Sequence, residues 1–252
     1  MRSVGRARIA IWEGGGLWLM EATHAALGVP SHAHHAIQVA VLLRGTMTVG
    51  TPGAKHADPI VAIDADAQHY LELDGAAALL FIDPESAAGR AAKLDLLAGR
   101  DVVAVAPERL ECELADLQSA WRDQRSAADL KLLGQNIVQD LLGKKAAPPT
   151  DPRVADLIAD LAERLDGPVG LSNLARSIEL SPSRLRHLFV EQTGMPLKSY
   201  ILWRRLMRAV ELVAQGSTMT DAAHAAGFSD SAHFSRTCRR MFGLPASALE
   251  FV

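Results

Sequence analysis

Residues 220–242 read TDAAHAAGFSDSAHFSRTCRRMF and decide the fold of the C-terminal part of the chain. Alanines at 222, 223 and 226 favour close packing of a short helix, and Gly227 favours its end. Ser229 or Asp230 then caps a second helix. The side chains that this second helix is predicted to bury are Phe234, Cys238, Met241 and Phe242. Its predicted outer face is polar and basic and carries Ser231, His233, Ser235, Arg236, Arg239 and Arg240.

The same design occurs earlier, in residues 171–193, LSNLARSIELSPSRLRHLFVEQT. A short apolar helix is followed by Ser181 as a helix cap and by Pro182 at the first helical position. The next helix is predicted to bury Leu185, Leu188 and Phe189, which are spaced i, i+3 and i+4. Its predicted outer face carries Ser183, Arg184, Arg186 and His187. A short helix, a tight turn and a second helix with a basic outer face form a helix-turn-helix, whose second helix enters the DNA major groove.

A helix predicted over residues 197–215 connects the two units. At 1.5 Å per residue it is about 28 Å long, and successive major grooves on one face of DNA lie about 34 Å apart. For one unit alone, a plain helix pair in a bundle is an alternative. Two units with basic outer faces at this spacing favour DNA binding.

The bulk composition is compatible with this interpretation. The net charge is −3, but residues 171–252 hold 10 Lys and Arg against 6 Asp and Glu, whereas residues 1–150 hold 14 against 18. The two cysteines, Cys112 and Cys238, have no metal-binding spacing and favour a reducing cytoplasm. We recognise no signal peptide and no apolar run of about 20 residues, and therefore expect a cytoplasmic protein without a membrane span.

The N-terminal part has a different pattern. Up to about residue 85, short apolar runs alternate with turn residues, which predicts a β-sandwich or barrel. Two helices with leucine stripes, over 108–121 and 126–142, follow as a helical appendage. The stripes predict a homodimer through residues 108–142, with burial inside one chain as the alternative. The predicted domains are residues 1–143, a proline-rich linker over 144–152, and an all-helical DNA-binding domain over 153–252.

The C-terminal hundred residues resemble the AraC/XylS family of transcription regulators. The resemblance rests on Gly227-Phe228, on Ser231 with Phe234-Ser235-Arg236, on the FGLP of 242–245, and on RLMRA at 205–209. The first unit matches through Ser181, Leu185, Phe189, Gly194 and Pro196. Two positions depart from the family pattern: Cys238 replaces a Phe or Ala, and Ala232 lies where a polar side chain is usual.

The resemblance implies double-stranded DNA as a partner, and RNA polymerase as a further one if the protein is an activator. It also implies which side chains touch DNA, since an Arg pairs bidentately with guanine and other basic residues contact phosphate. The implied base contacts are Ser183, Arg186, His187, Ser231, Ala232, Ser235 and Arg236. The implied phosphate contacts are Arg184, Arg239 and Arg240.

Residues 28–69 resemble the metal-binding pattern of cupin barrels. His32 and His34 lie two residues apart and would share one face of a strand, and His69 lies further along the chain. These imidazoles, with Gln38 nearby, would bind a divalent transition metal. Gln38 replaces the usual Glu, and Asp64 and Asp66 replace a Pro and a Gly.

The sequence leaves two uses of the barrel open. The histidines either bind metal or line a pocket for a small-molecule effector. Asp64 and Asp66 could orient a ligand imidazole, and His35 is predicted to lie on the surface or in a loop. We expect a sensor domain that controls DNA binding and no catalytic residues. A metal-dependent cupin enzyme fused to a DNA-binding domain is the alternative.

Overall fold

The structure, a computed structural model, describes residues 4–23, 25–142, 150–162, 164–165 and 170–252. Its contacts divide the chain into two compact units. The strand domain contains Met1–Ala147 together with Cys238–Val252, and the helical unit contains Pro148–Thr237. Most of the predicted linker, residues 144–149, lies outside the described residues, and Pro152 at its end already begins a helix.

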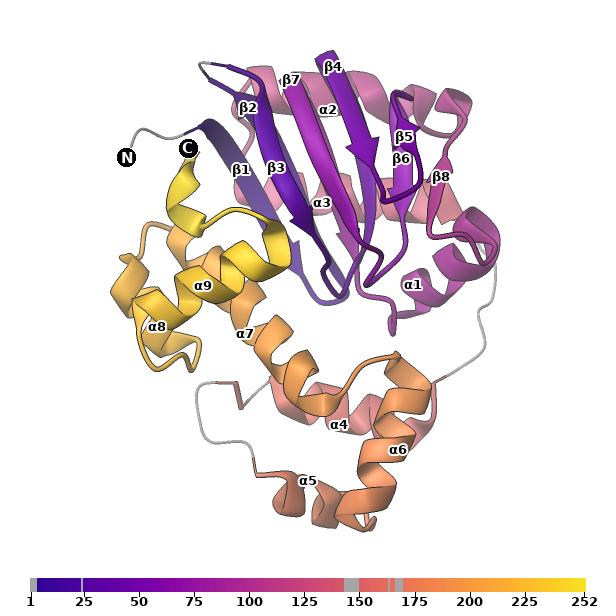
Figure 1. The fold of residues 1–252 in the computed structure, drawn as a ribbon, viewed down its shortest axis with the longest axis vertical. Coiled ribbons are helices and arrows are strands. Elements are labelled where there is room, and N and C mark those ends of the chain that lie inside the picture. Colours follow the sequence, from indigo (N-terminus) through magenta and orange to yellow (C-terminus); the bar gives the residue numbers. More distant parts are fainter. Residues whose placement is uncertain (1–3, 24, 143–149, 163, 166–169) are drawn as a thin grey trace. The chain divides into compact units, whose positions relative to one another are not determined.

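The strand domain is built on one sheet (Figure 1). Its strand order is β8-β6-β4-β7-β2-β1-β9, with β3 paired to β7 and β5 paired to β4. Within the described residues this order is open, with β8 and β9 at its ends. The strand-rich N-terminal domain predicted from the sequence is confirmed. Its strands are β1 (Gly5–Trp12), β2 (Gly15–Ala22), β3 (Leu27–His32), β4 (Ile37–Gly50), β5 (Lys55–His56), β6 (Ile60–Ile63), β7 (His69–Ile82), β8 (Val102–Ala104) and β9 (Leu249–Phe251).

Two glycines that the sequence presents as turn residues lie inside the longest strands. Gly45 of β4 and Gly75 of β7 are cross-strand partners, and both have positive φ, 89° and 124°. A Cβ on Gly45 would lie 1.9 Å from the carbonyl oxygen of Asp74. Because the backbones approach so closely, only glycine fits, and the strands continue through the pair.

Helices cover one face of the sheet, and α2 and α3 are drawn in pink behind it in Figure 1. Leu117 of α2 and Leu130 and Ile137 of α3 are buried in one core with sheet residues. The leucine stripes are therefore buried inside one chain, so they give no reason to expect a homodimer through residues 108–142. The helical elements are α1 (Ala87–Ala92), a π-helical turn (Lys93–Leu97), a 3-10 turn (Pro107–Leu110), α2 (Glu111–Arg122) and α3 (Ala127–Leu142).

The helical unit has its own core. Phe189 of α6 packs edge-to-face on Tyr200 of α7, with ring centroids 5.3 Å apart, and both side chains are buried. The bounds of α6 and α9 agree with the predicted helices. The helices are α4 (Pro152–Ala162), α5 (Leu171–Ser177), α6 (Pro182–Thr193), α7 (Leu197–Ala214), α8 (Met219–Ala225) and α9 (Ser231–Phe242), whose last turn belongs to the strand domain.

The end of the chain differs from the prediction of a purely helical C-terminal part. The all-helical domain predicted over 153–252 includes residues 246–250. Instead, a 3-10 turn, Ala246–Ala248, leads into β9, which pairs in parallel with β1. A three-residue strand depends on its distant partner, so local sequence periodicity carries no signal for it.

Candidate nucleic-acid interface and histidine cluster

The first candidate DNA-reading surface is the outer face of α6. The Ser181 hydroxyl accepts a hydrogen bond from the Arg184 N–H at 3.2 Å, and Pro182 follows at the first helical position. This cap starts the helix where the sequence predicts it. Leu185, Leu188 and Phe189 are buried, which turns the opposite face outward. The side chains exposed on that face are Ser183, Arg184, Arg186 and His187.

The second candidate surface is the outer face of α9. The Asp230 carboxylate accepts a hydrogen bond from the His233 N–H at 2.6 Å, so Asp230 caps the helix. His233 contacts its own neighbours: its Nδ1 lies 3.3 Å from the Ser229 hydroxyl, and its ring packs edge-to-face on Phe228. The exposed side chains are Ala232, Arg236, Arg239 and Arg240, and the half-buried ones are Ser231, His233 and Ser235.

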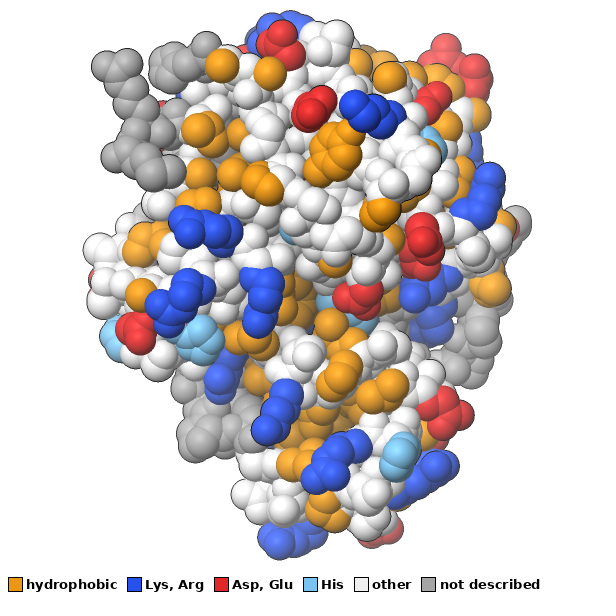
Figure 2. All heavy atoms as spheres, in the orientation of Figure 1, with side chains coloured by type: hydrophobic (Ala, Val, Ile, Leu, Met, Phe, Trp, Pro, Cys, Tyr) orange, Lys and Arg blue, Asp and Glu red, His pale blue; other side chains and the backbone are white. Residues whose placement is uncertain are grey.

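Both faces carry cations that can meet phosphate. Arg184 and Arg186 are exposed on α6, and Arg236, Arg239 and Arg240 are exposed on α9. On the molecular face of Figure 2, blue Lys and Arg side chains are frequent over the helices that follow the linker. Exposed guanidinium groups beside short polar side chains suit contacts to both phosphate and base edges.

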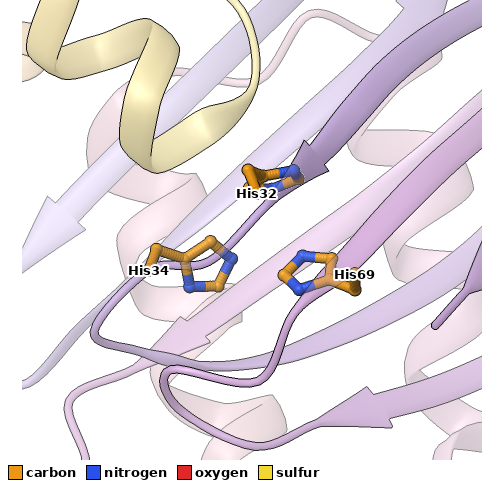
Figure 3. A group of neighbouring side chains, drawn as sticks. All are labelled: His32, His34 and His69. Carbon is orange, nitrogen blue, oxygen red and sulfur yellow. The ribbon is translucent and has the colours of Figure 1, made fainter. Parts of the chain in front are cut away.

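The three histidines predicted as metal ligands converge in the strand domain (Figure 3). His32 ends β3, His69 begins β7 as its cross-strand partner, and His34 lies in the connection from β3 to β4. One ligand nitrogen from each ring lies within 4.8 Å of the other two, and all three residues are buried. The two-residue spacing of His32 and His34 does not form the cluster by itself. The pairing of β3 with β7 brings His69 to His32.

Neighbouring groups hold the three rings in place. Nδ1 of His32 lies 2.8 Å from the Pro30 carbonyl oxygen, and Nδ1 of His69 lies 2.9 Å from that of Ala67. Such bonds place the proton on Nδ1 and leave Nε2 as the acceptor or metal-binding atom. Nε2 of His69 has no hydrogen-bond partner among the described residues. Nε2 of His34 lies 3.0 Å from Oε1 of Gln38 on β4, so the structure places Gln38 against a histidine ring.

The surroundings favour neutral rings. Burial, and to a smaller extent the neighbouring His69, lowers the pKa of His32 to about 4. Burial also holds the pKa of His34 well below its usual value and lowers the pKa of His69. Neutral imidazoles are the form that binds a metal, and three of them without a carboxylate suit zinc or a later first-row metal.

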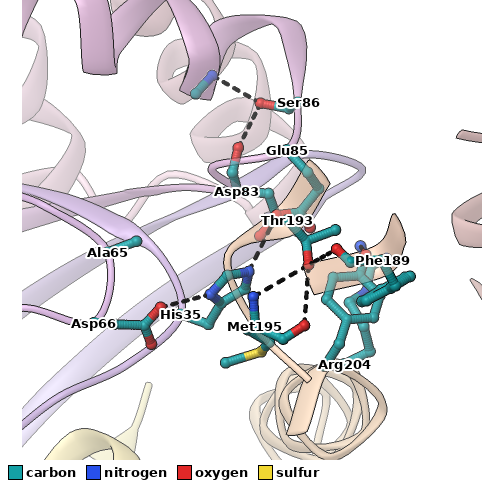
Figure 4. Close-up of polar contacts among 12 residues, drawn as sticks. His35, Ala65, Asp66, Asp83, Glu85, Ser86, Phe189, Thr193, Met195 and Arg204 are labelled. Atoms are coloured by element: carbon teal, nitrogen blue, oxygen red, sulfur yellow. Dashed lines mark hydrogen bonds and ion pairs between the residues drawn. The ribbon is translucent and has the colours of Figure 1, made fainter. Parts of the chain in front are cut away.

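His35 was expected on the surface or in a loop, and it lies in the connection from β3 to β4. It is buried, with Nδ1 3.0 Å from Asp66 and Nε2 3.3 Å from Glu85 (Figure 4). Burial alone would lower the pKa of His35, but the bonds to Asp66 and Glu85 outweigh it and raise the pKa to about 9. These ion pairs fix the segment that carries His34.

The expected role of the two aspartates is wrong. Asp66 bonds to His35, and Asp64 lies 3.7 Å from the Lys93 ammonium group. Neither carboxylate orients one of the three clustered rings, whose hydrogen bonds go to backbone carbonyls and to Gln38. The partners of His35 lie 31 and 50 residues away, so local sequence gave no signal for them.

Comparison with known proteins agrees with this geometry. Residues 174–250 match a family described as a helix-turn-helix domain. The arabinose operon regulatory protein of Salmonella typhimurium is 32% identical over 130 residues, 48% of this chain and 46% of that protein. The transcriptional activator RhaS of Escherichia coli is 33% identical over 114 residues, 45% of this chain and 39% of that protein. The chain thus spans less than half the length of these relatives.

Solved structures extend the likeness to the whole fold. ToxT from Vibrio cholerae O395 has a TM-score of 0.57 at 12% identity and covers 99% of each chain. ToxT of strain SCE256 with a bound unsaturated fatty acid has a TM-score of 0.55 at 11% identity and covers 98% of this chain and 96% of that one. These likenesses show the two-domain fold alone.

Two helix-turn-helix units joined by one helix define the C-terminal part as a domain of the kind that binds DNA. The matched domain and the relatives show a helix-turn-helix domain similar to that of these regulators, which agrees with the resemblance to the AraC/XylS family seen in the sequence. The relatives above are named as regulators and give no support to the alternative of a metal-dependent enzyme. Among the described residues, no helix is both long and apolar enough to cross a membrane.

Proposed function

We propose that this protein is a sequence-specific, double-stranded-DNA-binding transcription regulator that acts in the cytoplasm. The observation that carries the proposal is the pair of recognition helices, α6 and α9, each with a buried apolar side and an exposed basic side. An activator of this kind would also contact RNA polymerase. The naming of the relatives as regulators supports the proposal.

Within that function, the exposed residues divide into two roles. Arg186 and Arg236 are proposed to read guanine, because each lies mid-helix on an exposed face where a guanidinium can reach a base edge. Short polar or small neighbours would make the remaining base contacts: Ser183, His187, Ser231, Ala232 and Ser235. Arg184, Arg239 and Arg240 are proposed to contact phosphate, which positions the protein without selecting sequence. His233 is proposed to hold the start of α9 through Ser229 and Phe228.

Genome-wide capture of DNA fragments by the purified full-length protein tests this proposal. We expect enrichment of a defined sequence, and loss of that enrichment in an Arg186→Ala/Arg236→Ala double variant. Arg122→Ala, a matched exposed arginine on α2 of the strand domain, is the control and should bind as the parent does. Recovery of the same fragments by parent and double variant, without a shared sequence, would contradict the proposal.

For the strand domain we propose control by a divalent transition metal held by His32, His34 and His69. The residues fit such an ion: three neutral, buried imidazoles converge within 4.8 Å, and backbone carbonyls orient two of them. Gln38 would orient His34 or add a weak, uncharged ligand. A bound dication would supply fixed positive charge in a buried site and so tie three chain segments together.

Elemental analysis of protein purified without chelator tests the metal proposal. We expect stoichiometric metal in the parent, after reconstitution if necessary, and its loss in a His34→Ala/His69→Ala double variant. His56→Ala removes a histidine outside the cluster and should leave the metal content unchanged. Absence of metal from reconstituted parent protein would overturn the metal proposal. An organic effector, as in the fatty-acid-bound ToxT structure, would then be the better explanation of the buried site.

A further inference from the structure

The last fifteen residues of the chain pack on the strand domain. β9 adds to the edge of the sheet with the register Gly5 to Leu249, Arg6 to Glu250 and Ala7 to Phe251. Two flanking backbone hydrogen bonds extend this pairing, from the Val4 N–H to the Ala248 carbonyl at 2.9 Å and from the Val252 N–H to the Ala7 carbonyl at 3.1 Å. Consequently Cys238–Val252 belong to the same compact unit as the sheet.

This C-terminal tail also touches the histidine cluster. The Phe242 ring packs against Trp18 and Phe81, with centroids 4.8 and 5.9 Å away, and lies 5.9 Å from the His34 ring. In Figure 3 the yellow C-terminal ribbon passes beside His32 and His34.

Gly243 also packs against His32, at the Nδ1 edge of the ring. A Cβ on Gly243 would lie 2.7 Å from Val29, 2.8 Å from the Pro30 carbonyl oxygen and 3.1 Å from Nδ1 of His32. Gly243 thus packs against the hydrogen bond that fixes the His32 ring. That bond leaves the Nε2 edge of the ring for the cluster, so a docked tail and an ion at the cluster favour the same ring orientation.

The tail is the direct continuation of the second recognition helix. Residues 231–237 of α9, which include Arg236, belong to the helical unit, whereas Arg239 and Arg240 lie in the turn that packs with the strand domain. The strand domain, residues 1–147 and 238–252, has an excess of acidic side chains, 19 against 16 basic ones. Docking therefore constrains the end of α9. It also links this helix to a domain whose net negative charge repels DNA phosphates.

We propose that Cys238–Val252 form a latch that, while docked on β1 and the histidine cluster, lowers DNA affinity, and that an ion in the cluster strengthens the latch. The second half of this proposal rests on the proposed metal site. Because the ion and the tail favour one orientation of His32, linkage requires that DNA, which favours a free α9, weakens ion binding in return.

Two substitutions release the latch by independent routes. Gly243→Ala introduces the close contacts at Val29, Pro30 and His32. Glu250→Pro removes a backbone N–H from β9, far from the cluster, and so weakens the pairing with β1. The control is Gly216→Ala: Gly216 also has positive φ, +96° against +73° at Gly243, but a Cβ there meets nothing within 4 Å. The control therefore carries backbone strain without a steric clash.

The test measures DNA affinity and hydrogen exchange of the full-length chain, with and without Zn²⁺ as the probe. We expect both release variants to bind the captured DNA about fivefold more tightly or better, the lower end of ordinary coupling between sites, and the control to match the parent. Exchange at residues 4–9 and 244–252 should be faster in the release variants than in the control. Zn²⁺ should slow this exchange and weaken DNA binding in the parent, and have less effect in the variants.

The outcomes separate the latch from the functions on which it rests. Release variants that retain the parent's circular dichroism but bind DNA equally or more weakly would overturn the latch. Parent protein that binds Zn²⁺ without any change in exchange at the tail would overturn its link to the cluster, as would a parent that binds no Zn²⁺. If neither the parent nor any variant selects a DNA sequence, the proposed function fails. In that case, equal hydrogen exchange at residues 244–252 in the release variants and the control would also overturn the docking of the tail.

Discussion

The two recognition helices use one design in two different settings. α6 begins at the Ser181 cap, ends at Gly194 in the left-handed conformation, and lies entirely in the helical unit. α9 begins at the Asp230 cap, but its last turn and the chain that follows it pack with the sheet. Local sequence determines both helices equally well, but the chain that follows α9 belongs to the strand domain, which is the route of the proposed latch.

The largest expected effect concerns the buried phenylalanine of each recognition helix. Phe189 and Phe234 are both fully buried, so replacing either by Ala should lower the free energy of unfolding by about 3–5 kcal/mol. Urea unfolding measures the loss, and hydrogen exchange locates it. We expect Phe189→Ala to expose α5 and α6, and Phe234→Ala to expose α8 and α9 and also the tail. Equal exposure of the tail in both variants would remove the distinction between the helices.

The next effect concerns base reading. Arg186→Ala and Arg236→Ala should each weaken binding to the preferred site by about 1–3 kcal/mol, because each removes one bidentate contact to guanine. Selection of binding sites from random DNA should show lost preference at different positions for the two variants. Uniform weakening at every position would mean that both arginines contact phosphate.

A smaller effect concerns the helix caps. Ser181→Ala and Asp230→Ala should each cost about 1 kcal/mol of stability, because each leaves one N–H at a helix start without its side-chain acceptor. Thermal unfolding of the two variants measures the difference. Ser247→Ala alters an exposed residue in a 3-10 turn and should change the midpoint less than either cap variant. A cap variant as stable as this control would show that its hydrogen bond contributes nothing.

The smallest effect concerns the basic last turn of α9. Arg239→Ala should leave sequence preference unchanged and reduce the slope of log affinity against log salt by about 0.9, the value for one lost phosphate contact. Titrations with the preferred site at several salt concentrations measure this slope. A changed sequence preference would instead move Arg239 among the base readers.

The sequence predicted elements that local rules determine. The recognition helices follow from apolar residues at i, i+3 and i+4, from Ser181 and Pro182, and from Gly227. Local patterning gives little signal for β3, because its second half, Pro30 to His32, is polar and contains a proline. Gly45 and Gly75 have the composition of turn residues, so the sequence does not predict that β4 and β7 continue through them.

The histidine cluster was predicted by residue type, but its surroundings were not. His32, His34 and His69 do converge, whereas the burial of His35 was not predicted because its acidic partners come from distant segments. β9 was not predicted for the same reason, since a strand of three residues forms only where β1 offers an edge. Contacts between distant segments thus account for most of what the sequence did not predict.

The most direct test of the central claim, that two recognition helices read DNA together, is the pattern of preferred bases in sites selected by the full-length protein. We predict two preferred segments whose centres lie about 10 base pairs apart, one helical turn. Arg186→Ala should erase one segment and Arg236→Ala the other. A single preferred segment that both substitutions weaken alike would contradict the claim.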